Sequence, residues 1–142
     1  MSYTRLALCY LNSNELNTFA PAMKPTIVIG ASENTERYSN RVTKILHHKG
    51  IPVIAIGLKP GEIDGVKIQT GFPKIEAGVA TVTLYVGPQH QPPYYDYVLN
   101  LKPERVIFNP GTENPEFEEK VKKAGIKVLE ACTLTMLTVG NY

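Results

Sequence analysis

Thr26-Ile27-Val28-Ile29-Gly30-Ala31-Ser32 has the pattern of a buried strand that breaks at small residues, and an amphipathic run begins soon afterwards at Arg37-Tyr38-Ser39. β-Branched residues favour the strand, whereas Gly30 and Ala31 are small enough for the backbone to approach a ligand. The helix predicted next would offer free N–H groups and the positive end of its dipole to a phosphate. This pattern predicts the opening strand–helix unit of a nucleotide-binding fold.

Three polar side chains near this turn suit a phosphate. Ser32 and Ser39 carry hydroxyl donors, and Arg37 carries a planar guanidinium that can pair with phosphate oxygens. A tight turn of small residues also serves any doubly wound sheet, and an arginine on such a loop is often only solvated. Ligand binding is the favoured interpretation because other predicted strand ends agree with it.

Length and composition limit the function classes. The chain has 142 residues, 43% of them hydrophobic and 20% charged, which suits one globular domain. Its formal net charge of +2 includes no basic block, so neither nucleic acid nor a membrane surface is expected as a partner. Cys9 and Cys132 form neither a disulfide framework nor a metal-ligand pattern. Reduced thiols and a cytoplasmic location are therefore expected.

Residues 1–22 are expected to be an N-terminal extension that is peripheral to the fold or results from an upstream initiation codon. The apolar run at 6–11 is short, and a polar stretch follows it at 12–17, so no secretory signal is predicted. Met23 directly before the first strand is typical of a chain start. The folded domain is therefore expected at 23–142.

The rest of the chain alternates predicted strands and helices. Further strands are expected at 51–58, 79–86, 105–109 and 127–129, with a strand-like piece at 66–69 after a turn at 59–65. Helices are expected at 39–49, at 94–101, from Pro115 after an Asn114 cap, and at 133–139. The pattern predicts an α/β, Rossmann-like, doubly wound single domain with a mainly parallel five-stranded sheet.

The carboxyl ends of such strands form the usual ligand site, at the point where strand order reverses. The segments expected to gather there contain Gly or Pro beside polar groups: 30–39, 57–61, 87–91 and 109–114. An NAD site usually places Asp or Glu at the end of the second strand, to accept from the ribose 2′-hydroxyl. Here that end is Ile56-Gly57-Leu58-Lys59, and its cation favours a phosphorylated ribose, as in NADP or coenzyme A.

Three segments resemble the small stand-alone CoA-binding domain proteins, a family related to the nucleotide-binding domain of succinyl-CoA synthetase. They are Val28-Ile29-Gly30-Ala31-Ser32, Arg37-Tyr38-Ser39 and Lys59-Pro60-Gly61-Glu62-Ile63-Asp64-Gly65. The resemblance extends from Lys24 to about Leu137 and implies a Rossmann-like sheet that holds the ADP part of coenzyme A.

The resemblance also implies roles for the matching residues. Lys59 would meet the ribose and its 3′-phosphate. The loop Val86-Gly87-Pro88 would border the adenine or the pantetheine exit, and Asn109-Pro110-Gly111 would close the site from the next strand. The residues that would face the pyrophosphate are Gly30, Ala31, Ser32, Arg37 and Ser39, with Tyr38 in the same step.

Two places depart from the family pattern. Family members commonly have basic residues in the loop after the third strand, where this chain has Gly87-Pro88. They also have Asp-Arg before a late cysteine, where this chain has Glu130-Ala131 before Cys132. Cys132 is interpreted as a small core residue. His90 is the histidine placed at the expected mouth, and no nucleophile or carboxylate partner for it is evident.

The sequence is consistent with two main function classes. The first is a non-catalytic binding or regulatory module that binds coenzyme A or an acyl-CoA through its ADP part. The alternative is a small NADP-linked reductase subunit that needs a partner chain, although no proton donor for it stands out. An interaction module with a protein partner at the rim, or a homo-oligomer, is left open.

Overall fold

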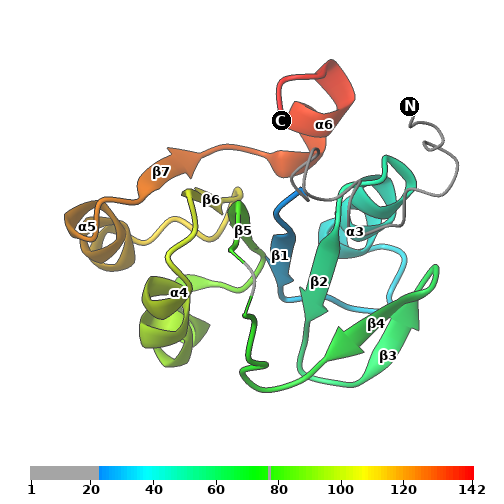
Figure 1. Ribbon diagram of the computed structural model, residues 1–142, viewed down its shortest axis with the longest axis horizontal. Coiled ribbons are helices and arrows are strands. Elements are labelled where there is room, and N and C mark those ends of the chain that lie inside the picture. The colour runs from blue at the N-terminus through cyan, green and yellow to red at the C-terminus, as the bar shows by residue number, and fades with distance from the viewer. Residues whose placement is uncertain (1–22, 77) are drawn as a thin grey trace, which may run out of the picture.

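The computed structural model describes residues 23–76 and 78–142, so the extension expected at residues 1–22 lies outside the described residues. Within them, a sheet carries helices on both faces (Figure 1). Its strands are β1 (Thr26–Ile29), β2 (Val53–Ile56), β3 (Gly61–Ile63), β4 (Val66–Gln69), β5 (Thr81–Leu84), β6 (Arg105–Phe108) and β7 (Lys127–Glu130). The helices are α3 (Tyr38–His48), α4 (Tyr95–Leu101), α5 (Pro115–Lys123) and α6 (Thr133–Val139), with 3₁₀ turns η1 (Pro88–His90) and η2 (Pro92–Tyr94).

The seven strands lie in the order β3-β4-β2-β1-β5-β6-β7. All neighbouring pairs are parallel except β3 with β4. β1 is central, and its last residue, Ile29, is in register with Ile56 of β2 and Leu84 of β5. From β1 the chain first adds β2, β3 and β4 on one side of the sheet and then adds β5, β6 and β7 on the other. Strand order therefore reverses between β1 and β5.

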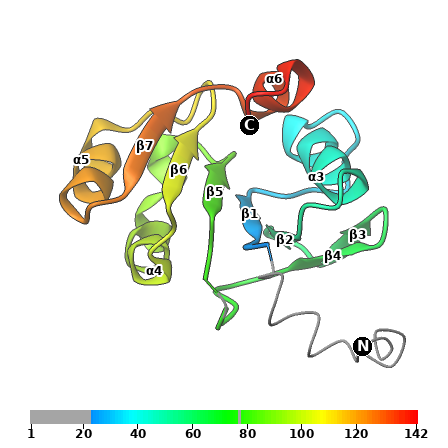
Figure 2. The ribbon, with the colours of Figure 1, turned by 45° about the horizontal axis from the view of Figure 1, so that its top comes forward.

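Two apolar clusters hold the helices against the sheet. Ile27 and Ile29 point to one face, where they join a cluster that includes residues of α4 and α5, whereas Val28 points to the other face with residues of α3 and α6. This alternation follows from the two-residue period of a strand. Figure 2 shows α4 and α5 on one side of the sheet and α3 and α6 on the other. Tyr94 and Tyr95 pack against the first cluster.

The predicted α/β architecture is confirmed, but the predicted number of strands is wrong. The five expected strands correspond to β1, β2, β5, β6 and β7, and two more extend the sheet beyond β2. The strand-like piece at 66–69 is β4, which pairs with β2, and Gly61–Ile63 pairs antiparallel with it. The turn between them is confined to Asp64 and Gly65, which both have positive φ, as an Asp-Gly hairpin requires.

Other local expectations are met within a residue or two. Asn114 caps α5 by accepting a hydrogen bond from the N–H of Phe117, and Pro115 is the first helical residue. α6 has the predicted bounds. No helix in the described part of the chain is both long and apolar enough to cross a membrane.

Candidate ligand-binding site

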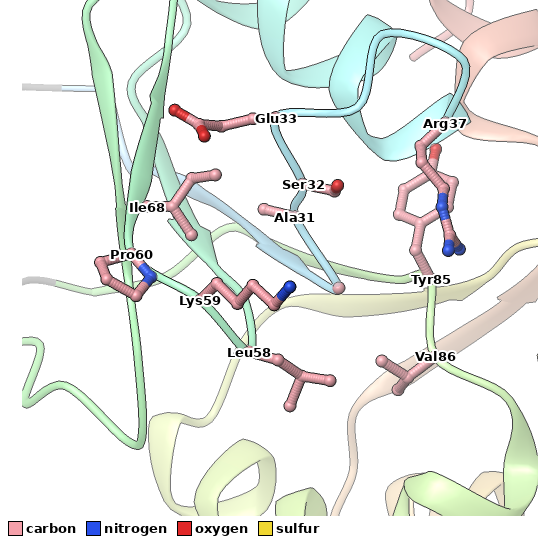
Figure 3. A pocket seen from close by; sticks show the side chains of 11 residues that line it. Ala31, Ser32, Glu33, Arg37, Leu58, Lys59, Pro60, Ile68, Tyr85 and Val86 are labelled. Atoms are coloured by element: carbon pink, nitrogen blue, oxygen red, sulfur yellow. The ribbon is translucent and has the colours of Figure 1, made fainter.

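A cavity of about 380 Å³ opens at the carboxyl ends of β1, β2 and β5, where strand order reverses. The loop after β1 forms its base, the turn after β2 forms one wall, and the residues after β5 form the opposite wall (Figure 3). Its lining consists of Gly30, Ala31, Ser32, Glu33, Arg37, Leu58, Lys59, Pro60, Ile68, Tyr85 and Val86.

Small residues let the two walls approach the turn at the base. Gly30 has a φ of +102°, which favours glycine, and a Cβ there would lie 3.0 Å from the backbone carbonyl of Tyr85. On the other side, a Cβ at Gly57 would lie 2.3 Å from the carbonyl oxygen of Ala31. The base of the cavity is therefore held between the ends of β2 and β5 with no space for larger residues.

Some backbone N–H groups of the loop after β1 form hydrogen bonds inside the protein, and others do not. The N–H groups of Gly30 and Ala31 both donate to the carbonyl of Ile56, at 2.8 and 2.9 Å. Within residues 23–76 and 78–142, no protein group accepts from the N–H of Ser32 or of Tyr38, the first residue of α3. An anion at this loop would therefore meet Ser32 and the start of α3 rather than the N–H groups of the glycine turn.

Two cations enter the cavity from opposite sides. Figure 3 shows Arg37 reaching down from the start of α3 and Lys59 reaching across from the turn after β2. Neither forms an ion pair with any acidic side chain that the structure describes. Because Glu33 is the only carboxylate in the lining, the cavity carries an excess of one positive charge. The arrangement suits an anionic ligand.

Six of the predicted site residues line this cavity: Gly30, Ala31, Ser32, Arg37, Lys59 and Val86. The other seven do not: Tyr38, Ser39, Gly87, Pro88, Asn109, Pro110 and Gly111. Tyr38 is exposed beneath the guanidinium of Arg41, and Ser39 is buried with its carbonyl accepting from the Thr43 hydroxyl. Contacts from these residues to a ligand remain predictions.

The side-chain amide of Asn109 forms hydrogen bonds inside the protein through both its nitrogen and its oxygen. Its Nδ2 donates to the Thr83 hydroxyl at 2.7 Å and to the Leu84 carbonyl at 2.8 Å, and its Oδ1 accepts from the N–H of Thr133 at 2.8 Å. The side chain thus fastens β6 to β5 and to the start of α6. Its polar groups are paired within the fold rather than offered to the cavity.

Gln91 fixes the wall after β5 in a similar way. Its Nε2 donates to the carbonyls of Val86 and Thr112, at 3.0 and 2.7 Å, and its Oε1 accepts from Asn114. The loops after β5 and β6 are therefore joined by a buried amide. His90 lies next to Gln91 on η1 but is exposed and does not line the cavity.

Sequence reasoning missed five lining residues: Glu33, Leu58, Pro60, Ile68 and Tyr85. Leu58 and Pro60 flank Lys59, so their proximity could have been inferred from the turn. Tyr85 follows β5, and burial raises the pKa of its hydroxyl above the ordinary value, so it stays protonated. Glu33 lies in the segment 30–39 that was expected at the rim, next to Ser32, but was not singled out. Ile68 could not have been found from local pattern, because it reaches the cavity from β4, whose placement depends on the whole sheet.

Cys132 differs from its interpretation as a core residue. It is half-buried, lies outside both apolar clusters and immediately precedes α6. Partial burial raises the pKa of its thiol, but hydrogen bonds from the Thr135 hydroxyl and from the backbone N–H groups of Thr135 and Leu134 outweigh this and lower the pKa overall. It does not line the cavity.

Comparison with known families fits this geometry. A family model described as CoA binding domain matches residues 24–138. The chain belongs to the CoA binding domain family. The match begins just before β1 and ends within α6, so it includes every element that forms the cavity. No curated protein matches this CoA binding domain.

Solved structures share the fold of this CoA binding domain. A crystal structure described as an uncharacterized protein is 48% identical, with a TM-score of 0.80, and the match covers 85% of this chain and 99% of that one. A hypothetical protein from Pyrococcus horikoshii OT3 is 25% identical, with a TM-score of 0.72 and 89% of both chains covered.

A larger protein contains a similar unit. The dinucleotide forming acetyl-coenzyme A synthetase 1 of Ca. Korarchaeum cryptofilum, solved with phosphate and ADP, is 19% identical, with a TM-score of 0.63. The match covers 81% of this chain and 26% of the synthetase. At this identity the likeness concerns the fold alone.

Proposed function

We propose that this CoA binding domain binds coenzyme A or an acyl-CoA through its ADP part, as a non-catalytic binding or regulatory module. The observation that carries the proposal is the convergence of Arg37 and Lys59, both without an ion pair in the described chain, on the turn at the base of the cavity. Family membership supports the same ligand.

The pyrophosphate fits the base of the cavity. Arg37 offers a bidentate fork, and Ser32 lines the cavity with an N–H that donates to no described protein group. Tyr38 begins α3 directly after Arg37, at the positive end of the helix dipole. Lys59, on the turn after β2, is assigned to the ribose 3′-phosphate, which its flexible stem allows it to follow. Two separate cations match the two separate phosphate groups of coenzyme A.

The apolar part of the lining suits the rest of the ligand. Leu58 is 90% exposed at the rim, beside Lys59 and opposite Val86 (Figure 3). A leucine this exposed gains contact and loses water when a flat or methylene-rich group covers it. We therefore place the adenine or the first part of the pantetheine between Leu58 and Val86.

A binding role fits the lining better than a catalytic one. The lining includes no histidine or cysteine, and the hydroxyl of Ser32 is engaged by the N–H of Asn34 at 3.1 Å. Nucleophilic catalysis needs a nucleophile paired with a base, and the lining residues do not provide such a pair.

Calorimetric titration with coenzyme A, dephospho-coenzyme A and NADP tests the proposal. Coenzyme A should bind most tightly, and K59A should weaken it about tenfold or more, the usual loss for a charged hydrogen bond, while changing dephospho-coenzyme A little. K67A is the matched control, because Lys67 is an exposed lysine of β4 that does not line the cavity. Equal losses of affinity for coenzyme A and dephospho-coenzyme A in K59A would contradict the assignment of Lys59. The absence of binding heat with all three ligands in the wild-type protein would contradict the proposed function.

A further inference from the structure

Glu33 places a carboxylate on the cavity wall where the end of β2 provides none. It belongs to the loop between β1 and α3, yet its Oε2 accepts a hydrogen bond from the backbone N–H of Glu62 in β3, 29 positions later, at 2.8 Å. Figure 3 shows Glu33 on the side of the β3–β4 hairpin, across the cavity from Arg37. The side chain is thus fixed by the backbone of another element.

Gly61 leaves the space that this carboxylate occupies. A Cβ at position 61 would lie 2.5 Å from Cδ and 2.8 Å from Oε2 of Glu33. Oε1 has no hydrogen-bond partner, and no cation lies within ion-pair distance, among the residues that the structure describes. One oxygen of this exposed carboxylate therefore has no partner among the described residues.

In nucleotide sites, an acceptor on this side of the sheet contacts the ribose. In Rossmann-type sites an acidic residue on the side of the second strand accepts a hydrogen bond from the ribose 2′-hydroxyl. Here the chain after β2 carries Leu58 and Lys59 instead, and Glu33 reaches that side from the first loop. The structure therefore provides the acceptor by a different route.

We propose that Glu33 is a specificity-determining residue whose free carboxylate oxygen accepts a hydrogen bond from the ribose 2′-hydroxyl of the adenosine of coenzyme A. This inference rests on the proposed function and deepens it. With Lys59 at the 3′-phosphate, the wall then recognises a ribose with one phosphate and one free hydroxyl. Because a carboxylate only accepts hydrogen bonds and carries negative charge, a phosphate at the 2′ position, as in NADP, is repelled.

Adenosine 3′,5′-bisphosphate and its 2′-deoxy analogue test this contact on the full chain, by calorimetry. The wild-type protein should bind the deoxy analogue about tenfold more weakly, because a hydrogen bond to a charged group is lost. E33A should bind both compounds equally. E36A is the matched control, since Glu36 lies in the same loop, is exposed and does not line the cavity, and it should keep the wild-type ratio.

The ratio of the two affinities separates a ligand contact from a structural effect. Loosening the loop would lower both affinities together, whereas loss of the 2′-hydroxyl contact changes their ratio. G61A gives a second variant: it keeps the carboxylate but displaces it, and should also bring the ratio towards one.

Three outcomes would overturn the inference. A wild-type ratio near one, with coenzyme A still bound, would remove the role of Glu33 and leave the proposed function standing. The wild-type ratio retained in E33A would do the same. If the wild-type protein binds neither coenzyme A nor the bisphosphate, the proposed function itself fails, and the inference fails with it.

Discussion

On the rim formed by residues 30–37 and 57–60, Arg37 and Lys59 have no ion pair in the described chain. On the rim formed by residues 87–91 and 109–114, the side-chain amides of Asn109 and Gln91 form hydrogen bonds inside the protein through both nitrogen and oxygen. We call these the cation rim and the network rim. Both follow the carboxyl ends of parallel strands and both contain Gly, Pro and polar residues. The difference shows that the composition of a rim is a weaker sign of ligand binding than the state of its polar groups.

The strongest test of this contrast is N109A, in the network rim. Loss of three buried hydrogen bonds should lower the free energy of unfolding by about 3 kcal/mol, measured by urea denaturation. The affinity of the folded protein for coenzyme A should stay within about twofold, since Asn109 does not line the cavity.

N100A is the control for this variant, because Asn100 is an exposed residue of α4. A tenfold loss of affinity in N109A with unchanged unfolding would break the contrast between the rims.

G57A should affect both stability and binding. The added Cβ would meet the Ala31 carbonyl oxygen at 2.3 Å, and the backbone shift should lower the free energy of unfolding by about 2 kcal/mol. Because Ala31 forms the base of the cavity, the affinity for coenzyme A should fall as well.

Thermal and urea unfolding, with calorimetry at a temperature where G57A is folded, would measure both effects. G78A is the control, since its Cβ would meet only the flexible Lys24 side chain, at 3.3 Å. Wild-type affinity in G57A would mean that the base of the cavity does not hold the ligand.

R37A should have the smallest effect on stability and a clear effect on binding. Arg37 is exposed, so the free energy of unfolding should change by less than about 0.5 kcal/mol, while the dissociation constant of coenzyme A should rise about tenfold or more. R41A is the matched control, because Arg41 is one turn further along α3 and does not line the cavity. Similar losses in R37A and R41A would indicate a general charge effect instead of a contact.

Much of the fold follows from local pattern. The β-branched strand before Gly30 and the Asn114-Pro115 start of α5 identify their elements because capping and alternation act over a few residues. β3 escaped prediction because Gly61–Ile63 is three residues long, and its pairing with β4 supplies what its sequence lacks.

The site was harder to predict than the fold. Sequence identifies residues with donors, such as Asn109 and Arg37, but it does not tell which donors are already paired inside the protein. Asn109 finds its partners on β5 and α6, whereas Arg37 finds none in the described chain. Glu33 was missed because its contact with Glu62 depends on where the hairpin is placed.

The most direct test of the central claim is an amide NMR titration of the full chain with coenzyme A. The claim is that the cation rim holds the ligand and that the network rim only supports it. The account predicts that the backbone amide signals of Ser32, Glu33 and Tyr38 shift as coenzyme A is added, while those of Gln91 and Thr112 change little. Large shifts at Gln91 and Thr112 with unmoved signals at Ser32, Glu33 and Tyr38 would contradict it.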